Sequence, residues 1–229
     1  MAEPVPPSHM AYDRTIVVFS PEGRLLQVEY ARQMVKNGTT SIGIRTKEGV
    51  LLAGVKVAPK LAILDSYKKI YQIDDHVAAV ISGSLADGRE LAELARVRAQ
   101  INRITYGEPA SILSLVTYIC DRKHLVTQYA GVRPYGVGML VGGVDDTGPR
   151  LFETDPSGTL MEWQAQAIGR GGDRARKVLT KGWKPGMTRE EGLKLLIKAA
   201  KEGEKGVGGE LEVIWITKKG IEKLDVKGF

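Results

Sequence analysis

Apolar and polar residues along this chain follow two periods, one typical of strands and the other typical of helices. A period of two, or a short apolar run between turn residues, predicts a series of short strands. These strands cover residues 41–45, 50–57, 69–73, 77–82, 136–144, 150–153, 159–163, 164–169, 211–217 and 221–224. Most neighbours in this series are joined by short turns, which favours antiparallel hairpins.

A period of three to four residues predicts helices between these strands. Two helices flank a break at 107–109, and two more follow residue 169. The first of the four carries apolar residues at steps of three and four, namely Leu91, Leu94, Val97, Ile101 and Ile104. The last begins at a capping box formed by Thr188 and Glu191.

The order of these elements predicts the fold class. Strands alternate with pairs of helices, and each sheet needs both of its apolar faces covered. Two antiparallel sheets packed face to face, with a helix pair outside each, satisfy that requirement. We therefore expect an α+β fold, a four-layer α/β/β/α sandwich, in a single domain over residues 11–229. Residues 1–10 are rich in Pro and poor in apolar residues, so we expect a mobile N-terminal tail there.

A further helix is predicted at about residues 20–36, ahead of the first strand. Ser20 and Pro21 suit its start, and the Asn-Gly pair at 37–38 suits its end. It carries two apolar stripes: Leu26, Tyr30 and Met34 form one, and Leu25, Val28 and Val35 form the other. Because an ordinary surface helix has a single stripe, we expect this helix to lie between its own domain and a neighbouring subunit. Complete burial inside its own domain is the alternative.

The composition narrows the class of protein further. The chain has 229 residues, of which 43% are hydrophobic and 26% charged, values typical of a globular domain. No apolar run is long enough to span a membrane, and Cys120 is the single cysteine, so we expect a reducing, cytoplasmic location and no internal disulfide. The three histidines have no ligand spacing, which predicts no metal site and no other cofactor. Cys120 and His124 are interpreted as a buried thiol beside a surface histidine.

The charge of the chain is uneven. The net charge is +6, and residues 170–229 supply all of it, with 15 Lys and Arg against 9 Asp and Glu. We interpret this region as a solvated helix surface, because the basic residues alternate with acids and lack interleaved aromatics. Nucleic acid is therefore not an expected partner, although a basic surface that binds it remains an alternative. The Gly-rich run at 169–172 lacks a phosphate-loop signature and is interpreted as a strand-to-helix turn.

A Gly-Thr-Thr run stands at the head of the first predicted strand. Threonine hydrolases release such a Thr by cleavage after the preceding Gly, and they need a Lys that is held by an acid. Lys69 can supply the amine, but Val55 occupies the place of the acid, which would leave the Lys unpaired. This argues against catalysis and predicts no catalytic residue. A self-processing threonine protease with Thr39 as nucleophile is the alternative.

One long stretch resembles the signature of proteasome α subunits of the archaeal type. It reads AYDR at 11–14 and FSPEGRLLQVEYA at 19–31. The motifs TQY at 127–129, GVRPYG at 131–136 and DPSG at 155–158 continue the resemblance. It implies the N-terminal-nucleophile hydrolase fold in a non-catalytic subunit. Such subunits form seven-membered rings that cap proteasome β subunits and control the entry of unfolded protein substrates.

The resemblance also implies roles for particular residues. Lys69, Gly38 and Leu25 match the pocket that receives the C-terminal tail of an activator ATPase. The residues that match the family's gate at the ring entrance are Tyr12, Asp13, Pro21 and Tyr30. Those that match the loop narrowing the family's pore are Tyr129, Ala130, Gly131 and Val132. Ala130 departs from the family, which usually has Gly there. A position that required a positive φ would make this Ala costly.

Overall fold

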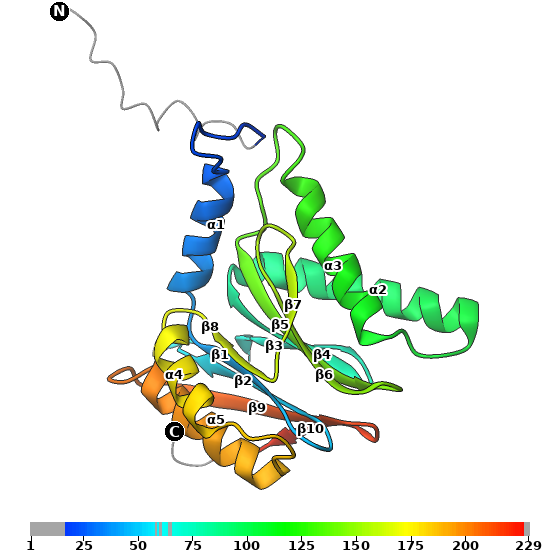
Figure 1. Cartoon of the computed structure of the whole chain (residues 1–229), viewed down its shortest axis with the longest axis vertical. Helices are drawn as coiled ribbons and strands as arrows, with labels where there is room; N and C mark the ends of the chain where they lie inside the picture. The colour runs from blue at the N-terminus through cyan, green and yellow to red at the C-terminus, as the bar shows by residue number, and fades with distance from the viewer. Residues whose placement is uncertain (1–16, 58, 60, 64–65, 227–229) are drawn as a thin grey trace, which may run out of the picture.

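Two five-stranded antiparallel sheets form the centre of the protein (Figure 1). The computed structural model describes residues 17–57, 59, 61–63 and 66–226, so the tail predicted at 1–10 lies outside them. One sheet has the order β10-β9-β2-β1-β8 and the other β3-β4-β5-β6-β7. The strands are β1 Ser41–Arg45, β2 Val50–Lys56, β3 Ile70–Asp74, β4 Val77–Gly83, β5 Val137–Asp145, β6 Gly148–Thr154, β7 Leu160–Glu162, β8 Ala165–Ile168, β9 Glu210–Thr217 and β10 Gly220–Leu224.

Two pairs of helices cover the outer faces of these sheets. Helices α2 (Leu85–Tyr106) and α3 (Ile112–Val126) pack on the β3–β7 sheet, while α4 (Gly172–Gly182) and α5 (Arg189–Gly203) pack on the other (Figure 1). Three apolar clusters fill the spaces between the layers. One lies between the α2–α3 pair and its sheet, one between the two sheets, and one between the α4–α5 pair and the other sheet. The four-layer sandwich expected from the sequence is confirmed.

The cap of α5 is formed as the sequence predicts. The Thr188 hydroxyl accepts a hydrogen bond from the backbone N–H of Glu191, and the Glu191 carboxylate accepts one from the N–H of Thr188. This reciprocal pair satisfies two donors that the first turn leaves unpaired.

The N-terminal helix begins later than predicted. Helix α1 is Leu26–Asn37, and the residues from Ser20 to Gly23 form a turn instead of its first turn. The N–H of Gly23 donates to the Ser20 carbonyl, and the N–H of Arg24 donates to the Ser20 hydroxyl. Gly23 has a φ of 75°, which a helix cannot contain. The Ser-Pro-Glu-Gly run that suggests a helix start is therefore a tight turn ahead of it.

Helix α1 packs on β4 and β5 with one side only. Leu26, Val28 and Ala31 are buried, whereas 50% of Tyr30 and 46% of Met34 are exposed. Complete burial within its own domain is therefore wrong for α1. The exposed apolar pair leaves a surface that another subunit can cover.

The apolar stripe predicted along α2 continues onto the surface. Val97, Ile101 and Ile104 are about half exposed or more. The buried face of α2 consists mainly of Leu91 and small residues, namely Gly88, Ala92, Ala95 and Ala99. Small side chains let the helix approach the sheet closely, so Leu91 stays in the core while Val97, Ile101 and Ile104 lie at the surface.

Candidate functional site

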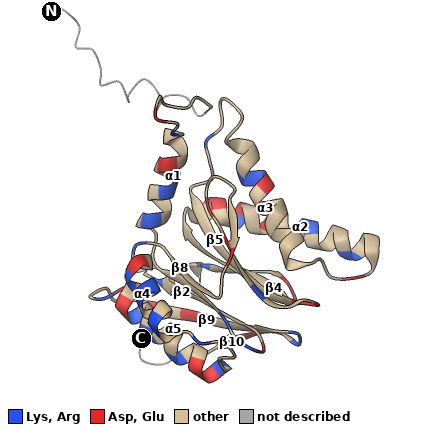
Figure 2. Cartoon of the chain, viewed as in Figure 1, with Lys and Arg blue, Asp and Glu red and all other residues tan. Residues whose placement is uncertain are grey.

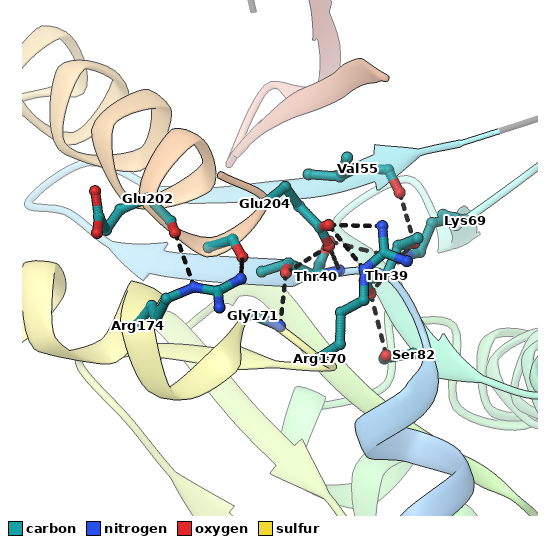
Figure 3. A network of polar contacts seen from close by, with 11 residues as sticks. Thr39, Thr40, Val55, Lys69, Ser82, Arg170, Gly171, Arg174, Glu202 and Glu204 are labelled. Carbon is teal, nitrogen blue, oxygen red and sulfur yellow. Dashed lines mark hydrogen bonds and ion pairs between the residues drawn. The ribbon is translucent and has the colours of Figure 1, made fainter. Parts of the chain in front are cut away.

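The buried ammonium of Lys69 is the centre of the candidate site. Lys69 precedes β3, and only 1% of the residue is exposed. Its Nζ donates hydrogen bonds to the Thr39 carbonyl at 2.7 Å and to the Thr39 Oγ1 at 2.6 Å (Figure 3). With Val55 in the place of the acid, Lys69 forms no ion pair among the described residues, and the backbone and hydroxyl oxygens of Thr39 accept its hydrogen bonds instead.

Thr39 is held on every side by the chain around it. Its Oγ1 donates to the Val55 carbonyl at 2.7 Å, at the position where a threonine hydrolase has its acid. The Ser82 hydroxyl donates to the Thr39 carbonyl at 3.1 Å, and the backbone N–H of Arg170 donates to the Gly38 carbonyl at 2.8 Å. The chain is continuous through Gly38 into α1, so Thr39 has a peptide nitrogen and no free amine that could act as a base.

A buried carboxylate that the sequence does not single out completes this cluster. Glu204 follows α5, and its side chain is 1% exposed. Its Oε1 accepts from the Thr40 N–H at 2.7 Å and from the Thr40 hydroxyl at 2.8 Å. Its Oε2 accepts from Nε of Arg170 at 2.8 Å and lies 2.7 Å from Nη2. We call Thr39, Thr40, Lys69, Arg170 and Glu204 the Thr39 cluster (Figure 3).

The electrostatics of the cluster follow from burial and from these two side chains. Burial lowers the pKa of Lys69 from 10.5 to about 7; the nearby Arg170 also lowers it, and the Glu204 carboxylate opposes both effects. Burial favours a raised pKa for Glu204, but hydrogen bonds from Arg170 and Thr40 outweigh it and lower that pKa. The cluster therefore holds one buried ion pair, between Glu204 and the partly exposed Arg170, beside a buried lysine whose pKa is about 7.

Glycines allow the backbones around the cluster to meet closely. A Cβ on Gly38 would collide with the Gly83 nitrogen and the Ser82 hydroxyl. The end of α5 and the turn before α4 touch in the same way, since a Cβ on Gly171 would collide with the Gly203 carbonyl. The run at 169–172 is the strand-to-helix turn that the sequence predicts, and Gly169 has a φ of 98°.

The structure brings some of the predicted pocket residues together and separates others. Gly38 and Lys69 are neighbours through Thr39. Leu25 precedes α1 and Gly38 follows it, so the two are about 20 Å apart along the helix at 1.5 Å per residue. A pocket containing all three therefore has to follow the length of α1.

The residues matched to the gate are only partly described. Tyr12 and Asp13 lie outside the described residues. Pro21 is exposed in the turn before α1, and Tyr30 is half exposed on the helix itself. The contact between these residues that the resemblance implies stays a prediction.

The residues matched to the pore loop connect α3 to β5. Tyr129 and Val132 are 59% and 46% exposed. Among the described residues every positive φ belongs to a glycine, including Gly131 with a φ of 87°. Ala130 therefore avoids the conformation that would have made it costly, and the left-handed position of the loop is the glycine beside it.

The cysteine and histidine of α3 do not form a reactive pair. Cys120 is buried, and burial raises its pKa to about 11. The His124 ring lies 3.3 Å from the Ser157 carbonyl. This matches the interpretation of a buried thiol beside a surface histidine. Within residues 17–226, apart from positions 58, 60, 64 and 65, no His, Cys, Asp and Glu side chains gather in a group that could hold a metal.

Comparison with known proteins identifies the family. A family model described as proteasome subunit matches residues 35–216, and one described as the N-terminal signature of A-type proteasome subunits matches residues 12–33. The chain belongs to the proteasome α-subunit family. The proteasome alpha subunit of Methanopyrus kandleri is 48% identical over 97% of this chain and 92% of the relative. Its counterpart in Methanocaldococcus jannaschii is 52% identical, over 94% and 82%.

Family membership gives the Thr39 cluster its context. The chain is an α subunit of the proteasome core particle and assembles with other proteasome subunits. Alpha subunits are non-catalytic, and catalysis in the proteasome belongs to the β subunits. The arrangement around Thr39 agrees with that class, since the position of the acid is filled by Val55. None of the helices in the described part of the chain is long and apolar enough to cross a bilayer.

Proposed function

We propose that this α subunit gates substrate entry into a proteasome core particle and docks the C-terminal tails of an activator ATPase. The observation that carries the proposal is the state of Lys69, an amine beside Gly38 that is buried without an acidic partner, so that a docked carboxylate would favour its protonated form. Seven copies would form a ring on a ring of β subunits, in a reducing cytoplasm. Unfolded protein would pass through the ring.

The charge of Lys69 supports the docking of a carboxylate. Its ammonium is satisfied by neutral oxygens of Thr39, and among the described residues no carboxylate lies within ion-pair distance of it. A tail that ends in a carboxylate would add the missing counter-charge and offset part of the cost of burial. Docking on Lys69 would require the side chain to turn from Thr39 toward a pocket completed by a neighbouring subunit.

The distance between Leu25 and Gly38 bears on the length of the tail. With its carboxylate at Lys69, an extended tail would reach the level of Leu25 after about six residues, at about 3.4 Å per residue. In that arrangement the tail meets the turn that contains Pro21, which precedes Leu25. Pushing on this turn would be the mechanical link between docking and the gate formed by Tyr12, Asp13, Pro21 and Tyr30.

The pore loop and the N-terminal segment would act at the same end of the molecule. The α3–β5 loop and the start of α1 both lie at the upper end of Figure 1. With Tyr129 59% exposed, a ring of seven such loops would form an apolar collar that admits unfolded chains. Deleting residues 1–14 in the assembled particle should raise the entry of peptides, and unchanged hydrolysis would argue against a gate.

One substitution tests tail docking directly. In particles assembled with a β subunit, Lys69→Ala should abolish stimulation of peptide hydrolysis by an activator ATPase, while ring assembly persists. Lys68→Ala removes an exposed lysine one residue away and is the matched control. Undiminished stimulation of the Lys69→Ala particle would show that the pocket is assigned to the wrong residues.

A further inference from the structure

A basic groove lies between the two helices that carry the excess charge of the chain. It has a volume of about 600 Å³ and runs between α4 and α5. Its lining consists of Arg174, Lys177, Val178, Lys181, Gly182, Leu195, Lys198 and Glu202. Four of these residues are cationic and one is acidic, and Figure 2 shows Lys and Arg on both helices.

The lysines of the groove form no ion pair within the described part of the chain, although the lining also holds the carboxylate of Glu202. Lys177, Lys181 and Lys198 are exposed, and among the described residues none of the three forms an ion pair. Lys177 and Lys181 are four residues apart on α4, where like charges lie side by side and destabilise a helix. The chain therefore keeps a concentration of positive charge that its neighbouring acids do not neutralise.

The fourth cation of the groove is fixed in place. The Nε of Arg174 donates to the Glu202 carbonyl at 3.1 Å, and its Nη2 donates to the Gly203 carbonyl. Backbone carbonyls hold the guanidinium without neutralising it, so its position is set before any partner arrives. Gly203 is followed by Glu204, so this end of the groove adjoins the Thr39 cluster.

The remaining lining residues indicate the kind of anion that would fit. Val178 and Leu195 provide an apolar floor between the cations. A nucleic acid would present phosphates to the lysines but would find no aromatic side chain in the lining on which to stack a base. An amphipathic polypeptide can place carboxylates against the lysines and apolar side chains against the floor.

We propose that the groove between α4 and α5 is a docking surface for an acidic, amphipathic segment of a partner protein. The segment binds by pairing its Asp and Glu side chains with Lys177, Lys181 and Lys198 while its apolar residues contact Val178 and Leu195. The surface is independent of tail docking, because neither Lys69 nor Gly38 contributes to it.

The test uses the full chain and a fluorescein-labelled peptide of Glu, Leu and Ala, about 14 residues long, which as a helix is about 20 Å in length. Fluorescence anisotropy should detect binding that weakens with salt. The triple variant Lys177→Glu, Lys181→Glu, Lys198→Glu should weaken binding about tenfold or more, because it removes three exposed ion pairs that each contribute modestly to the affinity. Circular dichroism checks that each variant is folded.

A matched variant and two competitors make the outcome specific. The matched triple variant makes the same change of charge at exposed lysines of the strand hairpins, with Lys47→Glu, Lys218→Glu and Lys219→Glu. Its affinity for the peptide should stay within about threefold of the wild-type value. Equal weakening by both triple variants, or no binding to the wild type, would overturn the proposal. The proposal would also be overturned if single-stranded DNA displaced the labelled peptide more readily than unlabelled peptide does. Undiminished binding of a peptide in which Ser replaces every Leu would overturn it as well.

Discussion

The Nζ of Lys69 lies 2.6 Å from the Oγ1 of Thr39, deep inside the protein. A lysine beside a threonine is the pair that a threonine hydrolase uses, yet here the hydroxyl donates to the Val55 carbonyl and the chain continues through Gly38. The pair therefore has structural and electrostatic consequences without the free amine that catalysis requires.

Lys69 should make stability depend on pH in the alkaline range. Its pKa is lowered from 10.5 to about 7, so between these values the unfolded chain holds a proton that the folded chain has released. The free energy of unfolding should therefore rise with pH from 7 to 10.5, by a few kcal/mol at about 1.4 kcal/mol per pKa unit. Urea unfolding of wild type and Lys69→Met across this range measures the difference.

The control for this prediction is Lys68→Met, which removes an exposed lysine. The free energy of unfolding of Lys68→Met should change with pH as that of the wild type does. The buried Lys123, whose pKa burial lowers to about 8, contributes equally to all three proteins and cancels in the comparison. Parallel profiles for Lys69→Met and wild type would contradict the prediction.

Glu204 should stabilise the fold through Thr40 and Arg170. Glu204→Gln removes the charge from a carboxylate that accepts from both residues, and it should lower the free energy of unfolding at pH 7 by roughly 3 kcal/mol. Because the pKa of Glu204 is lowered, this contribution is present above pH 4.5 and disappears as the pH falls through the folded-state value.

Glu202→Gln is the matched control for Glu204→Gln. Glu202 is exposed two residues away, and only its backbone carbonyl forms a hydrogen bond with Arg174. Its substitution should change the free energy of unfolding by less than about 0.5 kcal/mol. Equal losses in both variants would show that the buried network does not stabilise the fold.

Gly38 should tolerate no side chain. A Cβ at this position would collide with the Gly83 backbone and the Ser82 hydroxyl, so Gly38→Ala should lower the free energy of unfolding by about 1–3 kcal/mol. Gly208→Ala is the control, because Gly208 is exposed and a Cβ there meets nothing within 4 Å. Urea denaturation of the two variants compares them, and an unchanged free energy of unfolding in Gly38→Ala would contradict this close packing.

The exposed side of α1 should be needed for assembly more than for folding. Tyr30→Ser with Met34→Ser removes two half-exposed apolar side chains, and it should cost the isolated protein about 1 kcal/mol or less per residue. Native mass spectrometry should show loss of rings in the same variant. Gln33→Ser, on another exposed part of α1, should assemble normally. Intact rings in the double variant would argue that this face has no partner.

Much of the fold is predictable because its signals are local. The hairpin strands and the Thr188–Glu191 capping box depend on neighbouring residues, and the structure has them where the sequence predicts. The predicted start of α1 is wrong because Ser20 and Pro21 suit a turn as well as a helix. The choice depends on Gly23, whose positive φ ends any helix that includes it.

The candidate site could be predicted only in part. Thr39, Lys69 and the absent acid at Val55 follow from motif spacing. Glu204 does not, because it lies 164 residues from the Thr40 that it contacts and no local pattern distinguishes it from the exposed Glu202. The second half of the stripe predicted along α2, at Val97, Ile101 and Ile104, is exposed for a similar reason: periodicity locates apolar positions, while the alanines of α2 determine which face meets the sheet.

The intact mass of the chain purified from assembled particles tests the central claim most directly. If Thr39 is a permanent internal residue, mass spectrometry should find α1 still attached, with the mass of 25.0 kDa expected for all 229 residues. An epoxyketone inhibitor should label the β subunits alone. A mature chain that begins at Thr39 and carries the inhibitor would contradict the account.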